Sequence, residues 1–252
     1  MNPAEPQIVF EDDELLVVNK PAGMTVNNSD TTGYQSTLQD WIGERYKDSG
    51  LFSSESEHDF DRRNGIVHRL DKETSGVMLV AKKLPAFENL QSQFKERTVE
   101  KTYKALSHGV LVPEEGEISV PVGRLTWNRK QFGIIAGGRP AVTFYKTERV
   151  YKWEKESLSL LTLFPKTGRT HQIRVHLKYL GHPIFADFLY AGRKTARKDR
   201  RYLGRVFLHA YSISINHPKS NQRVSYSADL VSDLREFLKT LQDTDETGKQ
   251  YK

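Results

Sequence analysis

Apolar and polar positions along the chain form short runs that are separated by turn residues. Runs that are apolar throughout, or at every second position, predict strands over 7–10, 15–18, 66–67, 77–80, 98–110, 118–125, 141–150, 157–164, 206–216 and 222–227. Apolar residues at every third or fourth position predict helices over 37–46, 84–97, 170–181 and 231–241. Many strands with hairpin-length links and few helices predict an α+β fold, a mostly antiparallel mixed sheet with flanking helices.

One polar turn, from His68 to Gly76, lies between the apolar runs Ile66–Val67 and Val77–Val80. Its nine residues include five ionisable side chains, two hydroxyls and a glycine. An isolated cluster of this kind is most often a salt-bridged surface turn. A turn held between two buried strands is also a rigid platform for catalytic side chains, so the rest of the chain has to decide between these interpretations.

A bend is predicted directly after the second strand. Pro21 and Gly23 favour a sharp turn there, which would leave Asn19 and Lys20 at its tip. Most tips of this kind are only turns. Lys20 is therefore a candidate contact residue but no more than that on local grounds.

The helix predicted after Thr170, which can act as its N-cap, ends at Gly181. Its period places Arg174 at the edge of the buried face, where the guanidinium can reach inward to a carboxylate. Arg169 and Lys178 stay outside and can bind phosphates. This stretch predicts contacts to an anionic ligand.

The 252 residues are enough for one large catalytic domain with a full hydrophobic core. No apolar run is long enough to span a bilayer, and the first 19 residues carry acids where a secretory signal needs a basic start. We therefore expect a cytoplasmic protein without membrane contacts. The absence of cysteine excludes disulfides, thiol catalysis and cysteine-bound zinc.

The net charge of +6 is unevenly distributed. Residues 166–205 hold eleven basic side chains against Asp187 and Asp199, a local charge of +9, so the rest of the chain carries −3. The basic residues are Lys166, Arg169, Arg174, Lys178, Arg193, Lys194, Arg197, Lys198, Arg200, Arg201 and Arg205. A concentrated basic stretch of this kind is typical of a polyanion site, although a solvated charge run is an equal alternative for 193–205.

The reactive groups that these patterns leave are Asp71, a nearby arginine and a tyrosine. A close arginine keeps an aspartate ionised, which suits attack at an electrophilic carbon of a sugar or base without any cofactor. His171 and His176 are five residues apart with no acidic partner at metal spacing, so no metal is expected. The order His-Arg-Leu-Asp differs from the kinase signature His-Arg-Asp, and no nucleotide loop precedes it, which excludes a kinase.

Five motif blocks in this order resemble the RluA family of RNA pseudouridine synthases. They are VNKPAG (18–23), HRLDKETSG (68–76), KTY (101–103), TGRTHQIRVHL (167–177), and LHA with HP (208–210 and 217–218). One block alone would be weak, but the five together are very specific. The resemblance covers about residues 8–227.

The resemblance implies roles for single residues. Asp71 would be the catalytic aspartate, Tyr103 would stack on the uracil and assist proton removal, and Arg174 would be the basic partner of the aspartate. Arg69 would enter the space that the flipped uridine leaves. The uracil would be released from the sugar, turned and rejoined through carbon. Whether Asp71 attacks the base or the ribose, or assists glycal formation, is left open.

The predicted substrate is ribosomal or transfer RNA, and neither the RNA nor the uridine can be named from the sequence. The predicted RNA contacts are Arg69, His68, Lys20, Arg169, His171 and Lys178. We expect a monomer that needs neither metal nor cofactor. Two alternatives are a catalytically silent RNA-binding module on the same scaffold and a nonspecific nucleic-acid binder.

The family fold implies a bilobed catalytic domain with a central RNA-binding cleft. We expect this domain over residues 1–243, followed by a polar tail over 244–252. An N-terminal S4-type RNA-binding domain is not expected. Recognition would then rest on the catalytic domain, with segments 49–63 and 127–139 as candidates.

Overall fold

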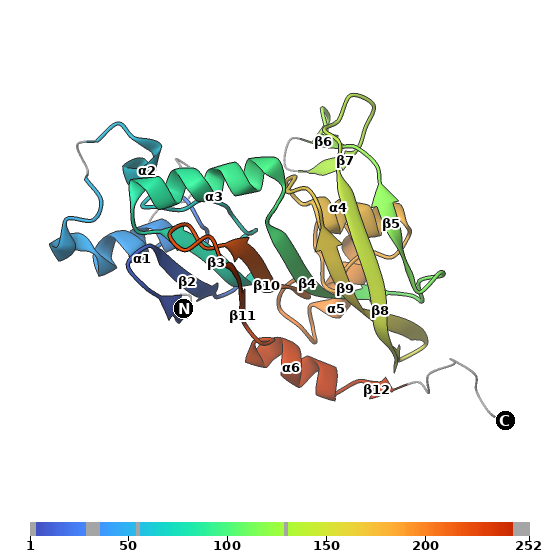
Figure 1. Cartoon of the computed structure of the whole chain (residues 1–252). Coiled ribbons are helices and arrows are strands. Elements are labelled where there is room, and N and C mark those ends of the chain that lie inside the picture. Colours follow the sequence, from blue (N-terminus) through green and yellow to red (C-terminus); the bar gives the residue numbers. More distant parts are fainter. Residues whose placement is uncertain (1–3, 29–35, 54–55, 129–130, 244–252) are drawn as a thin grey trace. The chain divides into compact units, whose positions relative to one another are not determined.

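The computed structural model describes residues 4–28, 36–53, 56–128 and 131–243, and the predicted tail 244–252 lies outside them. These residues form two compact units (Figure 1). The first unit takes the described residues of Met1–Glu100 and Ala210–Asp229, and the second those of Lys101–His209 and Leu230–Lys252. No helix in the described ranges is both long enough and apolar enough to cross a membrane. The single catalytic domain expected over 1–243 stays a prediction.

The first unit is built on strands in the order β1-β2-β3-β10, with β11 paired to β10. They span Gln7–Glu11, Leu15–Lys20, Ser75–Ala81, Leu208–Asn216 and Arg223–Ser227. The pairs β1–β2, β10–β11 and β2–β3 are all antiparallel. Every residue of β3 is buried, as a strand covered on both faces requires.

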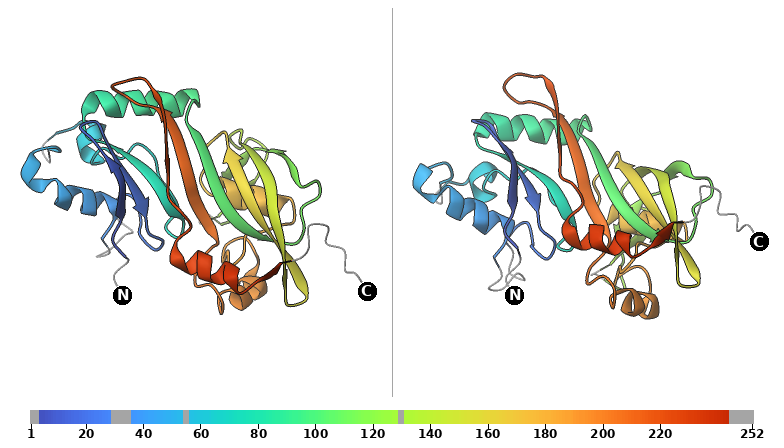
Figure 2. Two further views of the ribbon diagram at one scale, coloured as in Figure 1. Left: turned by 60° about the horizontal axis from the view of Figure 1, so that its bottom comes forward. Right: turned by 90° about the horizontal axis from the view of Figure 1, so that it is seen from below.

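The helical segments of this unit are α1, η1, α2 and α3, at Leu38–Arg45, Lys47–Ser49, Asp59–Arg62 and Leu84–Glu96. Thr37 caps α1: its hydroxyl accepts from the Asp40 amide at 3.1 Å, and the Asp40 carboxylate accepts from the Thr37 amide at 2.9 Å. Phe87 and Leu90 of α3 share the apolar core with residues of β3. Figure 2 shows α3 beside the strands of this unit. Segment 49–63, for which no helix was predicted, contains α2, and Phe60 of α2 is buried in the same core.

The second unit has the strand order β4-β9-β8-β12, with β5 paired to β8. These strands span Glu100–His108, Glu156–Pro165, Val142–Trp153, Gln242–Asp243 and Glu115–Ser119. A separate hairpin joins β6, Val122–Arg124, to β7, Phe132–Ile134. All of these pairs are antiparallel, which confirms the predicted sheet type.

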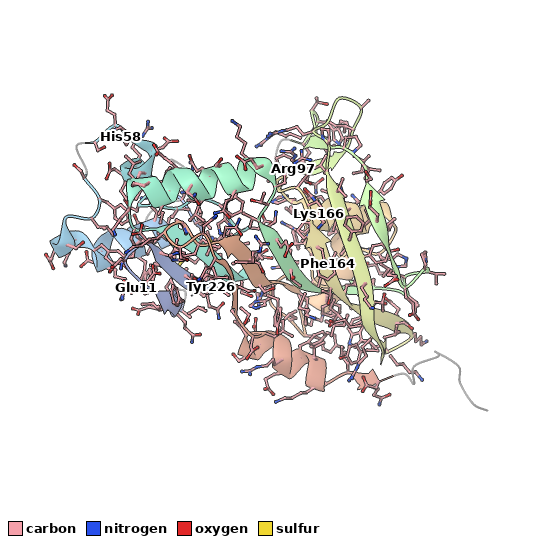
Figure 3. All side chains as sticks on the ribbon, viewed as in Figure 1. Glu11, His58, Arg97, Phe164, Lys166 and Tyr226 are labelled. Atoms are coloured by element: carbon pink, nitrogen blue, oxygen red, sulfur yellow. The ribbon has the colours of Figure 1, made fainter. Side chains whose placement is uncertain are left out.

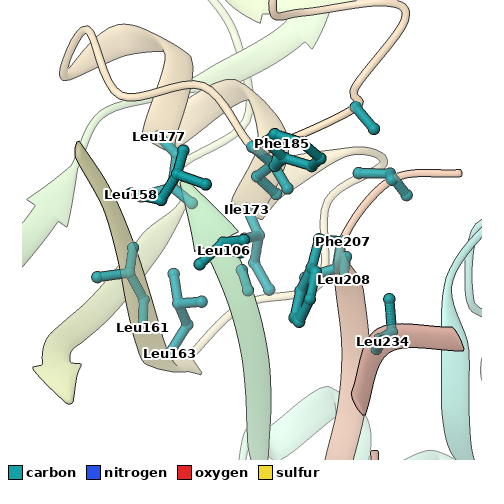
Figure 4. Close-up of a cluster of buried hydrophobic side chains, with 14 of the residues drawn as sticks. Leu106, Leu158, Leu161, Leu163, Ile173, Leu177, Phe185, Phe207, Leu208 and Leu234 are labelled. Atoms are coloured by element: carbon teal, nitrogen blue, oxygen red, sulfur yellow. The ribbon is translucent and has the colours of Figure 1, made fainter. Parts of the chain in front are cut away.

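Helices α4, α5 and α6 belong to the second unit, at Gln172–Tyr179, Arg193–Asp199 and Ser232–Lys239. Ile173 and Leu177 of α4 pack with Leu106, Leu161 and Leu163 from β4 and β9 (Figure 4). This face of α4 is the one that the helical period predicts. The core therefore holds α4 against the sheet and orients its remaining side chains.

Some predicted elements differ in the structure. The pair Ile66–Val67 makes one bridge, between Ile66 and Val80, instead of a strand. The strand predicted over 118–125 is divided at Pro121, because proline has no amide to donate to a ladder. Helix α5 was not predicted within the basic stretch. At α4 the N-cap is His171, with φ 55° and no side-chain capping bond, so the prediction of Thr170 as the cap is wrong.

Candidate active site

Asp71 lies half-buried in the loop that precedes β3 in the first unit. The loop is closed by a hydrogen bond from the Thr74 amide to the Asp71 carbonyl oxygen, at 3.1 Å. A second bond, from the Gly23 amide to the Lys72 carbonyl oxygen at 2.8 Å, ties this loop to the segment after β2. The backbone around Asp71 is therefore held at two points within its own unit.

Lys20 supports the same loop from below the surface. It is the last residue of β2, pairs with Gly76 of β3 and has no exposed area, so its predicted place at a turn tip is wrong. Its ammonium donates to the carbonyl oxygens of Pro21 at 2.7 Å, Met24 at 2.9 Å and Lys72 at 3.3 Å. A buried cation needs such acceptors. Lys20 is therefore sealed from solvent, and its role as an RNA contact stays a prediction.

His68 and Arg69, both predicted RNA contacts, differ in their surroundings. His68 Nε2 accepts a hydrogen bond from the Leu79 amide at 2.9 Å, and the His68 ring lies 4.9 Å from the ring of Phe94. These contacts anchor His68 to the strand and helix beside it. Arg69 is exposed and makes no hydrogen bond or ion pair with the described residues. Its guanidinium can therefore reorient.

The turn that begins at His68 ends at Gly76, where two backbone segments approach each other closely. Its φ is +121°, and a Cβ there would lie 2.2 Å from the carbonyl oxygen and 2.6 Å from the amide nitrogen of Ala210. Only a residue without a side chain allows the two backbones to approach so closely. The end of the Asp71 loop is thus held against β10 within the first unit.

Tyr103 and Arg174 belong to the second unit. Tyr103 lies on β4 opposite Leu163 of β9, and it is half-buried against the core of that unit. Arg174 lies on α4 and is buried. Since Asp71 belongs to the first unit, its joint action with Tyr103 and Arg174 stays a prediction.

The carboxylate that Arg174 reaches within its own unit is that of Asp187. Nε donates to Oδ2 at 2.7 Å and Nη2 donates to Oδ1 at 2.8 Å, while Asp187 is completely buried. Asp187 Oδ1 also accepts from the amides of Leu189, at 3.0 Å, and Tyr190, at 3.2 Å. The two-point pair fixes the plane of the guanidinium.

Three of the predicted site residues lie around Tyr190. Its hydroxyl lies 2.8 Å from His171 Nδ1 and accepts from the Phe132 amide at 3.0 Å. The Arg174 guanidinium carbon is 5.0 Å from the centroid of its ring, and Lys178 Nζ is 5.8 Å from it. These distances allow cation–π attraction. His171, Arg174 and Lys178 are therefore organised by a tyrosine that sequence reasoning did not single out.

Asp187 was also missed, although a signal for it existed. The two acids within the basic stretch, Asp187 and Asp199, are both completely buried. Asp199 Oδ2 lies 2.9 Å from His108 Nε2 and accepts from the Ala186 amide at 3.0 Å. Acidic residues within a strongly basic stretch are therefore candidates for buried partners of cations rather than for surface groups.

The basic stretch divides into internal and external cations. Arg174 pairs with Asp187, Arg205 with Asp233 and Lys198 with Glu154, while Arg200 donates to the carbonyl oxygens of Ala186 and Gly204. Arg169, half-buried, donates Nε to the Pro140 carbonyl oxygen at 3.1 Å. The exposed cations are Lys166, Lys178, Arg193, Lys194, Arg197 and Arg201.

His176 is completely buried, with Nδ1 3.0 Å from Thr143 Oγ1 and Nε2 3.2 Å from the Val120 carbonyl oxygen. Burial lowers the pKa of this imidazole, so the neutral form is favoured. His176 is therefore a structural residue. Within the part of the chain that the structure describes, no three His, Asp or Glu side chains form a group able to hold a metal ion.

Comparisons with known proteins agree with these motifs. The model of the RNA pseudouridylate synthase family matches residues 14–179. A ribosomal large subunit pseudouridine synthase D of Neisseria meningitidis serogroup B is 40% identical over 241 residues, 93% of this chain and 60% of that protein. The uncharacterized RNA pseudouridine synthase YlyB of Bacillus subtilis is 36% identical over 95% of this chain and 74% of its own length.

A solved structure shares the fold. Human RNA pseudouridylate synthase domain containing 1 has a TM-score of 0.69 and 27% identity, covering 97% of this chain and all of that chain. The chain spans only 60% of the length of the Neisseria protein. The chain described here therefore belongs to the RNA pseudouridylate synthase family, in its RluA branch.

Proposed function

We propose that this chain converts specific uridines of ribosomal or transfer RNA to pseudouridine. The bond between N1 of uracil and C1′ of the ribose breaks, and a bond between C5 and C1′ forms. The proton on C5 is released and N1 takes one up, so atoms and charge balance without an oxidant, metal or cofactor. The name of the Neisseria relative favours ribosomal RNA as the substrate.

The observation that carries the proposal is the support of the Asp71 loop. The loop is bound through the Lys72 carbonyl oxygen by both the Lys20 ammonium and the Gly23 amide. Loops fixed by a buried charge present a reactive group in one geometry, which is a requirement of catalysis. We assign the essential carboxylate to Asp71, stacking and proton removal to Tyr103, and the cationic partner to Arg174.

Base flipping is part of the proposal. The reacting atoms of a stacked uridine are inaccessible, so the nucleotide has to leave the stack at a cost of a few kcal/mol. Arg69 suits insertion into the vacated space because it is exposed and makes no polar contact with the described residues. Phosphate contacts by exposed cations of the basic stretch offset part of the cost.

The test uses Asp71→Asn, which keeps the side-chain shape but removes the negative charge of the carboxylate. The substituted and unsubstituted chains are incubated with ribosomal RNA and transfer RNA transcripts, and pseudouridine is measured by mass spectrometry after nuclease digestion. We expect no pseudouridine with Asp71→Asn, while RNA affinity stays within about twofold.

A matched control is Glu73→Gln, which removes a carboxylate two residues further along the same loop. It should retain most of the activity. Pseudouridine formation by Asp71→Asn would contradict the proposed role of Asp71. If the unsubstituted chain bound RNA but formed no pseudouridine in any transcript, the silent RNA-binding module would be the better description.

A further inference from the structure

Lys101 is a half-buried cation that the proposed chemistry does not use. It lies on β4 two residues before Tyr103, so both side chains point to the same face of the strand. Among the residues that the structure describes, Lys101 makes no hydrogen bond and no ion pair. A lysine in that state is unusual, because burial of an unpaired charge costs free energy.

The other charged residues of β4 are paired. Glu100 forms an ion pair with Arg223, at 3.1 Å, and Lys104 forms one with Glu148. Lys104 lies three positions from Lys101 and hence on the opposite face. The lack of a carboxylate at Lys101 is thus a local feature and not a general property of this strand.

A second cation, Lys166, influences the charge of Lys101 from the other face of the sheet. Lys166 directly follows Pro165, the last residue of β9, and it is exposed (Figure 3). Its ammonium lies 5.8 Å from the ring of Phe144. Burial, and secondarily the charge of Lys166, lower the pKa of Lys101 to about 8. Lys166 is three positions after Leu163, the partner of Tyr103, so its side chain lies on the opposite face of the sheet and Lys101 alone faces the side of Tyr103.

We propose that Lys101 binds one phosphodiester of the RNA substrate beside the nucleotide held at Tyr103. This inference rests on the proposed function, since it places the target nucleotide at Tyr103. Two positions along a strand separate Lys101 from Tyr103 by about 7 Å, so one nucleotide can reach both side chains. The phosphate contact fixes the backbone while the base is turned.

The lowered pKa of Lys101 predicts that this contact depends on pH. A phosphate stabilises the protonated amine, so binding should draw a proton onto Lys101. The affinity for RNA should therefore fall as the pH rises from 7 to 9, through the pKa of about 8. An arginine at this position stays protonated throughout this range.

The experiment measures binding of oligouridylate RNA to the full chain by fluorescence anisotropy, between about 50 and 200 mM KCl. We expect Lys101→Met to weaken binding about tenfold and to reduce the slope of log K against log salt by about 0.7 to 0.9. Lys101→Arg should keep the slope and remove the pH dependence between pH 7 and 9. Lys104→Met is the matched control, because that charge is already neutralised by Glu148.

Three outcomes decide the inference. A slope and pH profile that are unchanged in Lys101→Met would overturn it, and so would an equal loss in Lys104→Met. If Lys101→Met failed to fold, Lys101→Arg would decide, because a pH dependence between pH 7 and 9 that is unchanged in Lys101→Arg would also overturn the inference. Binding needs no turnover, so these results are independent of pseudouridine formation: absence of pseudouridine counts against the proposed function alone.

Discussion

The guanidinium of Arg174 and the carboxylate of Asp187 form a buried two-point ion pair, with Nε–Oδ2 at 2.7 Å and Nη2–Oδ1 at 2.8 Å. Asp187 is in turn fixed by the amides of Leu189 and Tyr190. Arg174 thus has one preferred orientation that residues of its own unit determine. Any further partner has to meet the guanidinium in that orientation.

Asp187→Asn should therefore disturb Arg174 without removing it. The amide keeps the shape of the carboxylate but leaves a buried cation without its counter-charge. We expect a loss of about 3 kcal/mol in the free energy of unfolding, measured with urea, and a strong fall in pseudouridine formation. Glu154→Gln, which breaks the exposed pair with Lys198, should change stability by less than about 1 kcal/mol. Equal behaviour of the two variants would contradict the prediction.

Lys20→Met separates support of the loop from contact with RNA. Methionine fills a similar volume but leaves the carbonyl oxygens of Pro21, Met24 and Lys72 without their donor. We expect lower stability in urea and little pseudouridine, with RNA affinity unchanged within about twofold. A variant that keeps its stability but loses affinity would show that Lys20 binds RNA after all.

Gly76→Ala should be among the most damaging single-methyl changes in the first unit. The added Cβ would meet the Ala210 backbone at 2.2 Å, and φ of +121° is unfavourable for alanine. We expect destabilisation of more than about 2 kcal/mol by chemical denaturation. Gly204→Ala is the control, because no atom lies within 4 Å of its added Cβ. Similar stability of the two variants would refute the close approach.

The ionic cluster around Glu11 predicts how stability depends on pH. Burial alone would raise the pKa of Glu11, but hydrogen bonds from Tyr46, Lys82 and Arg45 outweigh burial and lower it from 4.5 to about 2. A depressed pKa in the folded state gives stabilisation that is complete above pH 4.5 and is lost as the pH falls toward 2. Burial and the bond to Glu11 raise the pKa of Tyr46 to about 12, so its contribution is complete below pH 10 and is lost as the pH rises toward 12.

Glu11→Gln tests this assignment. We expect it to cost about 2 kcal/mol at pH 7 and to reduce the steepness of acid unfolding between pH 4.5 and 2. The measurement is urea unfolding at a series of pH values. The same acid dependence in the variant and the unsubstituted chain would rule out Glu11 as the titrating group.

Helix α5 offers a test of the proposed phosphate contacts. Arg193 and Arg197 are exposed, lie four residues apart and make no ion pair within the described residues, whereas Lys198 is held by Glu154. Reversal of both arginines to glutamate should weaken RNA binding and lower the salt slope by about 0.7 to 0.9 for each phosphate that the variant no longer binds. Arg235→Glu on α6 serves as a control for net charge. An unchanged salt slope in the double variant would show that Arg193 and Arg197 do not bind phosphates.

Local patterns were sufficient for much of this protein. The spacing of Phe87 and Leu90 predicts α3, and Thr37 predicts the start of α1, because helical period and capping depend on residues within one turn of each other. The antiparallel strands follow from alternation in the same way. The ordered motif blocks around Asp71 identify the family, since each block is contiguous in the chain.

Long-range contacts decided the rest. Lys20 looks like a turn residue in sequence, yet it is buried because it meets a carbonyl oxygen 52 positions away, at Lys72. Arg174 is predicted to seek a carboxylate, but nothing local singles out Asp187, which becomes its partner when loop 184–191 packs beside α4. Burial and pairing of charges depend on which segments the core brings together. Sequence spacing records only neighbours along the chain.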